Sequence, residues 1–375
     1  MLPFVDLQTQ YSRLQAEMEE AVLAVLRGGK YIMGPEVAEL ETQLSDFVGV
    51  GQCITCASGT DALVMALMAK GVGRGDAVFT TPFTFVATAE AIATVGATPV
   101  FVDIDAATFN IDPAKLDEAI GRSKKNGAAN PRAIIAVDLF GLPADYQAIN
   151  AIAARESLLV IEDAAQSFGA TAGNRRAGAL AEIGCTSFFP AKPLGCYGDG
   201  GAIFTDDAGT ADLLRSIRVH GQGADKYENV RLGITGRLDT IQAAILLVKL
   251  RAFEREIEER QRVAAGYAEA IRTAGISLQT PAVPEGLTSA WAQYSVLADS
   301  SAERERMMGQ LAAADVPSAI YYPKPLHLQQ AFAYLGYRAG DFPISEDAAS
   351  RIFALPMHPY LDEPTIATVV GALRG

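Results

Sequence analysis

Apolar residues recur at helical spacing over residues 8–26 and 35–47, and a pair of glycines follows the first of these runs. Further along, short apolar runs alternate with runs of helical periodicity. The pattern predicts strands at residues 53–56, 77–81, 99–102, 133–137 and 158–161, and helices at residues 63–70, 84–95, 113–120 and 144–156. Such an alternation is typical of a largely parallel sheet that helices cover on both faces.

The second half of the chain begins with a predicted strand at 201–205 and a helix at 209–220. The polar, glycine-bearing segment 221–235 is expected to be a mobile loop, and residues 123–131 a surface loop. A long helix at 237–273 starts with residues that are apolar on too many sides to face water, so we expect a core or a subunit interface there. The remaining predicted elements are strands at 291–298 and 318–322 and helices at 302–314, 345–353 and 363–373.

We therefore expect an α/β protein with two domains, which agrees with a length of 375 residues. Residues 1–250 would form a large α/β domain together with the N-terminal helices. Residues 251–375 would form a small C-terminal α/β domain.

One lysine lies in an unusual setting. Lys192 follows the apolar residues of a probable strand and precedes the glycine cluster at 198–201. A partly desolvated lysine has a lowered pKa and can act as an amine nucleophile that forms a Schiff base. Taken alone, Lys192 reads as a solvated lysine in a turn.

A carboxylate upstream changes this balance. The apolar run 158–161 predicts a buried strand, and Asp163 follows at its C-terminal end, where open α/β sheets bind their ligands. A lysine for a Schiff base and an aspartate for a pyridinium nitrogen are the two protein groups that a pyridoxal phosphate (PLP) enzyme needs.

An anion site is a second candidate feature. The small residues 57–60 connect a predicted strand to a helix, and free N–H groups at a helix N-terminus attract anions. A plain N-cap formed by Ser58 or Thr60 explains the same residues equally well.

Composition narrows the classes of function. The net charge of −13 and the pI near 4.8 argue against nucleic acid or an anionic membrane as the partner. Neither a secretory signal nor an apolar run long enough to span a bilayer is evident, so we expect a cytoplasmic protein. Cys53 and Cys56 match the C-x-x-C spacing of zinc and redox sites, but on a strand they point to opposite faces, which favours structural burial. The three histidines are far apart, and we expect no metal site.

Five motifs in a fixed order carry a family resemblance. They are Ser-Gly-Thr at 58–60, Thr-Phe-Val-Ala-Thr at 84–88, Glu-Asp-Ala-Ala-Gln at 162–166, Ser-Phe-Phe-Pro-Ala-Lys at 187–192 and Gly-Asp-Gly-Gly at 198–201. From about residue 4 to about residue 359 the chain resembles the DegT/DnrJ/StrS family of PLP-dependent nucleotide-sugar aminotransferases. The resemblance implies PLP-dependent transferase fold type I, with a mostly parallel seven-stranded sheet, and a homodimer with shared active sites.

The resemblance also implies roles for single residues. Lys192 would hold PLP, Asp163 would pair with its ring nitrogen, Gln166 would lie near the ring oxygen and Phe85 would stack on the ring. Phosphate contacts would come from Gly59, Thr60 and Ser187. Without this context, Phe85 reads as a core aromatic residue at the start of a helix.

At one position the chain departs from the family. Members usually have an asparagine in a G-x-N-x-R pattern, given by the neighbouring subunit to the phosphate, and Thr235 stands there. Threonine still donates one hydrogen bond, so Thr235 is kept as a phosphate contact.

Among family members, the chain looks most like enzymes that transfer an amino group from L-glutamate to C3 of UDP-2-acetamido-2-deoxy-3-keto-glucuronic acid, for lipopolysaccharide O-antigen sugars. Arg237 is then the candidate for binding the sugar carboxylate, because a guanidinium binds a carboxylate bidentately. A structural pair between Arg237 and Asp239 or another acid is the alternative. Tyr322 and His327 are candidate contacts to sugar or nucleotide.

Other functions stay open. The same chemistry on a 3-keto- or 4-keto-6-deoxy sugar of dTDP or UDP is the nearest alternative. Sugar dehydratases of the family typically carry histidine in place of Lys192, and a cysteine desulfurase would need a cysteine on a mobile loop rather than Cys196. A non-enzymatic sugar-nucleotide or PLP sensor is the alternative from another class. A Rossmann dehydrogenase is disfavoured because no G-x-G-x-x-G follows the first strand.

Overall fold

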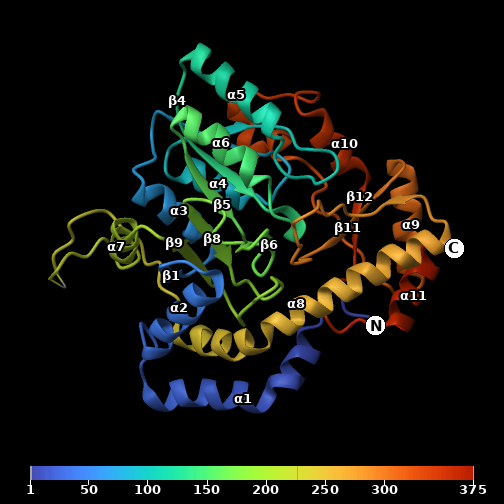
Figure 1. Cartoon of the computed structure of the whole chain (residues 1–375), viewed down its shortest axis with the longest axis horizontal. Helices are drawn as coiled ribbons and strands as arrows, with labels where there is room; N and C mark the ends of the chain where they lie inside the picture. The colour runs from blue at the N-terminus through green and yellow to red at the C-terminus, as the bar shows by residue number, and fades with distance from the viewer. Residues whose placement is uncertain (1, 226, 375) are drawn as a thin grey trace.

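A seven-stranded sheet forms the centre of the computed structural model, which describes residues 2–225 and 227–374. Its strands lie in the order β1-β9-β8-β5-β4-β2-β3 (Figure 1). They are β1 (Gln52–Cys56), β2 (Asp76–Thr80), β3 (Thr98–Phe101), β4 (Asn130–Val137), β5 (Leu159–Asp163), β8 (Ile183–Ser187) and β9 (Gly201–Thr205). Only β9 is antiparallel to its neighbours β1 and β8, so the predicted mostly parallel α/β sheet is confirmed.

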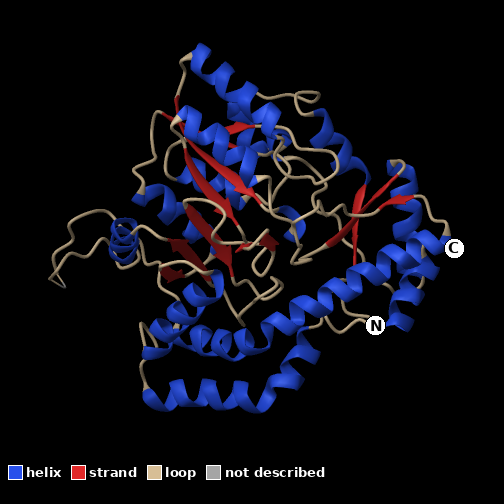
Figure 2. Ribbon diagram, viewed as in Figure 1, coloured by secondary structure: helices blue, strands red, loops and turns tan. Residues whose placement is uncertain are grey.

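Helices pack on both faces of this sheet (Figure 2). Alternate residues of β4 enter different cores: Ala133 and Ile135 pack with helices α3, α4 and α7, whereas Ile134 and Ala136 pack with α5 and α6. The helices of this part are α1 (Leu7–Gly28), α2 (Pro35–Val48), α3 (Gly59–Ala69), α4 (Ala87–Thr94), α5 (Pro113–Asn126), α6 (Tyr146–Glu156) and α7 (Ala208–Ile217). A strand buried on both sides needs apolar residues throughout, which explains its continuous apolar run.

The cysteines of β1 follow the prediction for a strand. Cys53 packs in the core formed with α1, α2 and the long helix α8 (Thr240–Ala274), and Cys56 packs in the core on the other face. Both are buried and free, so their structural burial is confirmed.

Helix α8 (Thr240–Ala274) crosses the molecule from the large sheet to the C-terminal unit (Figure 1). Its first half packs with α1 and α2, which confirms the predicted burial of the apolar stretch. Its second half contributes Val263, Tyr267 and Ile271 to a separate core. The domain boundary after residue 250 falls inside this unbroken helix and stays a prediction.

The C-terminal unit contains a three-stranded antiparallel sheet, β10 (Leu278–Gln279), β11 (Tyr294–Ala298) and β12 (Ile352–Leu355). Its other helices are α9 (Ser301–Ala313), α10 (Pro343–Arg351) and α11 (Glu363–Ala372), and 3-10 turns cover Leu326–Leu328 and Gln330–Leu335. A further 3-10 turn, Leu139–Gly141, lies between β4 and α6. No helix in residues 2–225 and 227–374 combines the length and apolar character needed to cross a bilayer.

Several predicted elements were wrong in detail. The strand expected at 318–322 is reduced to one bridge between Ala319 and Ala354. The helix expected at 345–353 ends at Arg351, and Ile352 and Phe353 belong to β12, because a short apolar run does not distinguish helix from strand. Within the expected loop 123–131, α5 continues to Asn126 and β4 starts at Asn130. The two-residue strands β6 (Thr171–Ala172), β7 (Arg175–Arg176) and β10 had no sequence signal.

Candidate active site

The ends of two neighbouring strands bring Lys192 and Asp163 to one edge of the sheet. Strands β5 and β8 are parallel, and Asp163, the last residue of β5, lies opposite Cys185 of β8. After β8 the chain turns, and the N–H of Lys192 donates to the carbonyl of Phe189 at 2.9 Å. This is the carboxyl edge at which open α/β sheets bind ligands.

The ammonium group of Lys192 is partly withdrawn from water. Burial lowers its pKa below the ordinary value, and the charge of Asp163 opposes this shift. A larger fraction of Lys192 is therefore a neutral amine near pH 7, which is the form that attacks a carbonyl group.

Asp163 is buried, and its partners are few. Its Oδ2 accepts a hydrogen bond from the Thr88 hydroxyl at 2.8 Å, and its Oδ1 accepts from the N–H of Ala165 at 3.3 Å. Burial raises the pKa of Asp163, and these two bonds together with Lys192 oppose that shift. No cationic side chain in the described part of the chain forms an ion pair with it within 4.0 Å. A protonated ring nitrogen would supply the missing positive partner, so Asp163 fits the pyridine ring of PLP.

Gln166 is held in one orientation by contacts on both sides of its amide. Its Oε1 accepts from the backbone N–H of Phe140 at 2.7 Å, and its Nε2 donates to the hydroxyl of Tyr322 at 3.1 Å. The ring of Phe85 lies 6.4 Å from that of Tyr322 and is 54% exposed. The structure thus groups Phe85, Gln166 and Tyr322, and Phe85 presents an open aromatic face rather than the core packing considered as its alternative.

The turn before α3 provides the candidate anion site. The side chain of Ser58 accepts from the N–H of Asp61 at 3.0 Å, so Ser58 is the N-cap of the helix. No partner is seen in the described residues for the N–H groups of Gly59 and Thr60. A Cβ atom on Gly59 would lie 2.6 Å from the Cβ of Ser187, so glycine is required where this turn meets the end of β8. Gly59, Thr60 and Ser187 therefore lie together, and a helix N-terminus with free N–H groups suits a phosphate.

Thr235 lies at the end of the loop that follows α7, which projects from the molecule in Figure 1. Its side chain is exposed, and its Oγ1 lies 2.9 Å from Nε2 of His220. Residue 226, inside the loop predicted for 221–235, is outside the described residues.

Arg237 is available for a ligand. It is partly buried, and its Nε is enclosed without a hydrogen-bond partner. The pair with Asp239 that sequence reasoning considered is not formed, and no other acidic group of the described chain forms an ion pair with Arg237. A buried guanidinium N–H without an acceptor favours a ligand that brings one.

His327 has a different environment from the other candidates. Its side chain is fully enclosed, its Nε2 lies 3.0 Å from Glu346 Oε1, and its ring centre lies 4.7 Å from that of Phe342. Burial lowers its pKa. In this arrangement His327 has no free surface for a ligand.

Two residues near Asp163 and Gln166 were not assigned roles from the sequence. Thr88 belongs to the motif at 84–88, so the motif itself carried the signal. Phe140 acts through its backbone N–H, which no residue type reveals.

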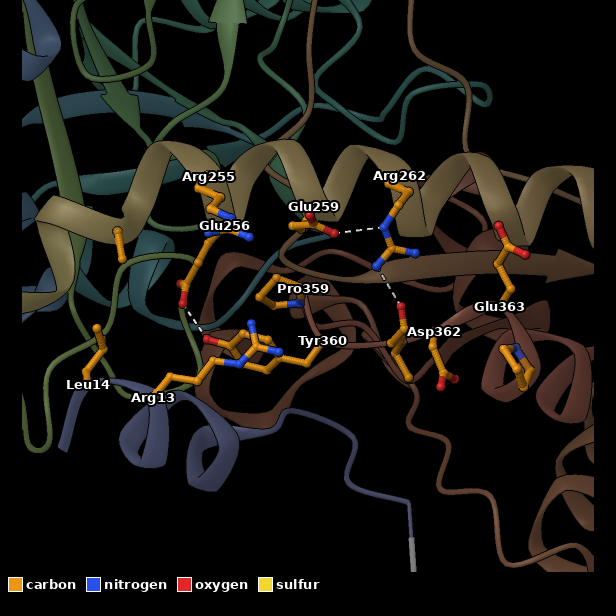
Figure 3. Close-up of a pocket in the computed structure, with 13 residues that line it drawn as sticks. Arg13, Leu14, Arg255, Glu256, Glu259, Arg262, Pro359, Tyr360, Asp362 and Glu363 are labelled. Carbon is orange, nitrogen blue, oxygen red and sulfur yellow. Dashed lines mark hydrogen bonds and ion pairs between the residues drawn. The ribbon is translucent and has the colours of Figure 1, made fainter.

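A pocket of about 640 Å³ elsewhere contains none of these residues. It lies between α1, α8 and residues 359–364 (Figure 3). Arg13 lies over the ring of Tyr360 at 4.4 Å, and the Tyr360 hydroxyl donates to Glu256. The pocket is thus separate from the site that Lys192 and Asp163 form, and its lining side chains contact one another.

Comparison with known proteins agrees with this geometry. Residues 12–374 match the model of the DegT/DnrJ/EryC1/StrS aminotransferase family. A Pseudomonas aeruginosa protein, UDP-2-acetamido-2-deoxy-3-oxo-D-glucuronate aminotransferase, is 49% identical over 373 residues, which cover 100% of this chain and 99% of that protein. The crystal structure of a DegT/DnrJ/EryC1/StrS aminotransferase from Brucella abortus is 51% identical, with a TM-score of 0.96 and coverage of 100% and 99%. NtdA from Bacillus subtilis with bound cofactor PMP is 29% identical, with a TM-score of 0.89 and coverage of 99% and 82%.

Proposed function

Since the chain belongs to the DegT/DnrJ/EryC1/StrS aminotransferase family, we propose that it moves an amino group from L-glutamate to C3 of UDP-2-acetamido-2-deoxy-3-keto-glucuronic acid, with PLP as cofactor. The observation that carries the proposal is that half-buried Lys192 and buried Asp163 lie close enough to interact electrostatically at the carboxyl edge of the sheet. The substrate rests on the 49% identity, over the full chain, to the Pseudomonas aeruginosa aminotransferase.

PLP fits the residues present. PMP, the cofactor named for NtdA, is the aminated form of PLP. When bound, the cofactor supplies an electron sink that stabilises negative charge on the carbon atom that loses a proton. Asp163 would accept a hydrogen bond from the protonated ring nitrogen, and its burial would strengthen that bond.

Lys192 has two tasks in this proposal. Its Nζ would hold the cofactor covalently. When the amino donor takes that place, the freed amine would accept the proton that Cα of the donor loses, as a general base, and would then donate it as a general acid. The lowered pKa of Lys192 favours the neutral amine, which is the form that can accept a proton.

The phosphate would lie at the N-terminus of α3, held by the N–H groups of Gly59 and Thr60 and the hydroxyl of Ser187. Phe85 would cover one face of the ring, and Gln166 would lie near the ring oxygen with its amide held by Phe140 and Tyr322.

Arg237 would bind the C6 carboxylate of the sugar, because its enclosed Nε has no other acceptor. Tyr322, already next to Phe85, is the second proposed substrate contact. His327 is left out of the proposed contacts because its side chain is enclosed.

We further propose a homodimer in which Thr235 of one copy contacts the phosphate in the other. The projecting loop carries exposed apolar side chains, Val230 and Leu232, the latter 88% exposed, which a second copy would cover. The enzyme would act in the cytoplasm and supply an amino sugar for a lipopolysaccharide O-antigen. Sedimentation velocity would test the dimer, because a purely monomeric species at micromolar concentration would contradict it.

Incubation with PLP, L-glutamate and a panel of keto-sugar nucleotides, followed by mass spectrometry, tests the proposed reaction. We expect amination of the 3-keto uronic acid and little product from 3-keto- or 4-keto-6-deoxy sugars of dTDP or UDP. If only a 6-deoxy sugar is aminated, that sugar rather than the 3-keto uronic acid is the substrate. No amination of any sugar and no spectral change with glutamate would favour a sugar-nucleotide or PLP sensor.

A further inference from the structure

A second lysine is buried beside the segment that carries Lys192. Lys249 on α8 is 2% exposed, and its Nζ donates to the carbonyl oxygen of Gly195. The same Nζ lies 4.9 Å from the ring centre of Tyr197. Burial lowers the pKa of Lys249 to about 8, and the charge of Glu256 opposes this shift.

Lys249 forms no ion pair with an acidic side chain in the described part of the chain. Burying an ammonium group without a carboxylate costs free energy, so the other contacts of Lys249 must compensate for this cost. The two contacts identified for Lys249, the carbonyl of Gly195 and the ring of Tyr197, both belong to the segment that follows Lys192.

A second residue of α8 contacts the same segment. Gln242 lies two helical turns before Lys249 and therefore on the same side of the helix. Its Oε1 accepts from the N–H of Tyr197 at 2.9 Å, and its Nε2 lies 3.4 Å from the carbonyl oxygen of Tyr197. One amide side chain thus fixes both backbone groups of Tyr197.

Gly195 transmits this contact to the turn that carries Lys192. A Cβ atom on Gly195 would lie 2.5 Å from the carbonyl oxygen of Pro190 and 2.6 Å from that of Phe189. The same Phe189 oxygen accepts the backbone hydrogen bond of Lys192. A shift of Gly195 would therefore move the carbonyl group of Phe189, which accepts the hydrogen bond that orients the backbone of Lys192.

We propose that Lys249 and Gln242 are positioning residues, which fix the segment from Gly195 to Tyr197 so that the amine of Lys192 points at the cofactor site. The inference rests on the proposed function of Lys192. It differs from a purely structural role for Lys249, which would change the stability of the fold but not the reactivity of Lys192.

Three variants separate these roles. Lys249→Met keeps the length and apolar stem but removes the donor, and Gln242→Leu removes both contacts to Tyr197. Arg251→Met is the matched control, because Arg251 lies on the same helix with its side chain 57% exposed, paired with Glu17. Circular dichroism and thermal melting verify that each variant folds, and Lys249→Arg, which keeps a cationic donor, serves as the conservative replacement.

Two measurements report on Lys192 itself. In PLP-free protein, the rate of reductive methylation of the Lys192 peptide, followed by mass spectrometry from pH 6 to 10, gives the reactivity and apparent pKa of the amine. In the second, absorbance follows the rate at which the protein captures added PLP. We expect Lys249→Met and Gln242→Leu to capture PLP about tenfold more slowly, with an altered methylation profile, because small displacements of a reacting group cost large factors in rate. Lys249→Arg should recover most of the rate, and Arg251→Met should match the wild type.

If Lys249→Met and Gln242→Leu both fold, capture PLP at the wild-type rate and show the wild-type methylation profile, the positioning role is overturned. If Lys249→Met does not fold, Gln242→Leu decides by the same two measurements. Failure of the wild-type protein to capture PLP would overturn the proposed function instead, and the methylation profiles would still decide whether α8 positions Lys192.

Discussion

The hydroxyl of Thr88 donates a hydrogen bond to Oδ2 of Asp163 at 2.8 Å, and so joins the first turn of α4 to the end of β5. Because Asp163 is buried, its negative form depends on the few donors that reach it. Thr88 therefore helps to keep Asp163 ionised and holds its carboxylate in the orientation that the proposed contact with the cofactor ring nitrogen requires.

Replacement of Thr88 by valine keeps the shape of the side chain and removes this donor. We expect the pKa of Asp163 to rise further, so that the acid limb of the kcat/KM profile moves to higher pH. A lost bond to a charged group is worth about 1.5–3 kcal/mol, so activity near pH 7 should fall about tenfold or more. Thr84→Val is the control, since the hydroxyl of Thr84 reaches only that of Thr88 at 3.3 Å. An unchanged profile in Thr88→Val would show that Asp163 does not depend on this bond.

Replacement of Lys192 by alanine should abolish transamination and the visible absorbance of PLP-loaded protein, because no other group is proposed to hold the cofactor covalently. Lys70→Ala is a suitable control, since Lys70 forms an ion pair with Glu182 away from the site. The measurements are the rate with glutamate and the spectrum after dialysis against PLP. Retained turnover in Lys192→Ala would remove this residue from its assigned role.

Replacement of Arg237 by alanine should affect the uronic acid substrate more than its 6-hydroxy analogue. Loss of one partner from a buried charge pair costs several kcal/mol, so kcat/KM for the uronic acid should fall about hundredfold. The 6-hydroxy analogue, which lacks the carboxylate, should lose much less. Equal losses for both substrates would mean that Arg237 supports the fold or another part of the ligand.

A buried carboxylate pair behind the site predicts a pH-dependent stability. Asp138 accepts hydrogen bonds from Ser167, Tyr146 and the N–H of Ala144, and burial raises its pKa to about 7 next to the equally buried Glu162. Between about pH 4 and pH 7 the folded state therefore holds a proton that the unfolded state has released, so stability falls as the pH rises through this window.

Asp138→Asn removes the titrating group and keeps acceptors for Ala144 and Tyr146. Wild type should lose stability between pH 5 and pH 8, and Asp138→Asn should lose less. The free energy of unfolding of the variant minus that of wild type should therefore rise by about 1 kcal/mol or more between these two pH values. Urea denaturation at both values measures the difference, and Asp212→Asn, whose side chain is 79% exposed, is the control. If the free energies of unfolding of Asp138→Asn and wild type differ by the same amount at both pH values, the raised pKa of Asp138 is contradicted.

The sheet was predictable because its signal is local. Each buried strand needs a continuous apolar run and each covering helix an apolar stripe, so the alternation along the chain gives the order of elements. Strand β12 was missed because Ile352 and Phe353 continue the apolar pattern of α10, and only pairing with β11 decides their conformation.

The site was predictable to the extent that its residues lie in motifs. Asp163 ends strand β5 and Lys192 follows strand β8, and parallel strands place their ends together. The bond from Thr88 to Asp163 joins residues 75 positions apart, and the contact of His327 with Glu346 joins residues 19 apart, so both depend on packing that the sequence pattern does not describe.

Strand β1 has a single neighbour in the sheet, β9, which lies about 150 residues later in the sequence. During translation, residues 52–56 must therefore wait unpaired until residue 205 has left the ribosome. The candidate anion site at Gly59 also needs Ser187 and Gly201, so a nascent chain halted before that point would lack the proposed phosphate site. Contacts this far apart in sequence form slowly, and the unpaired strand is a natural client for chaperones until β9 arrives.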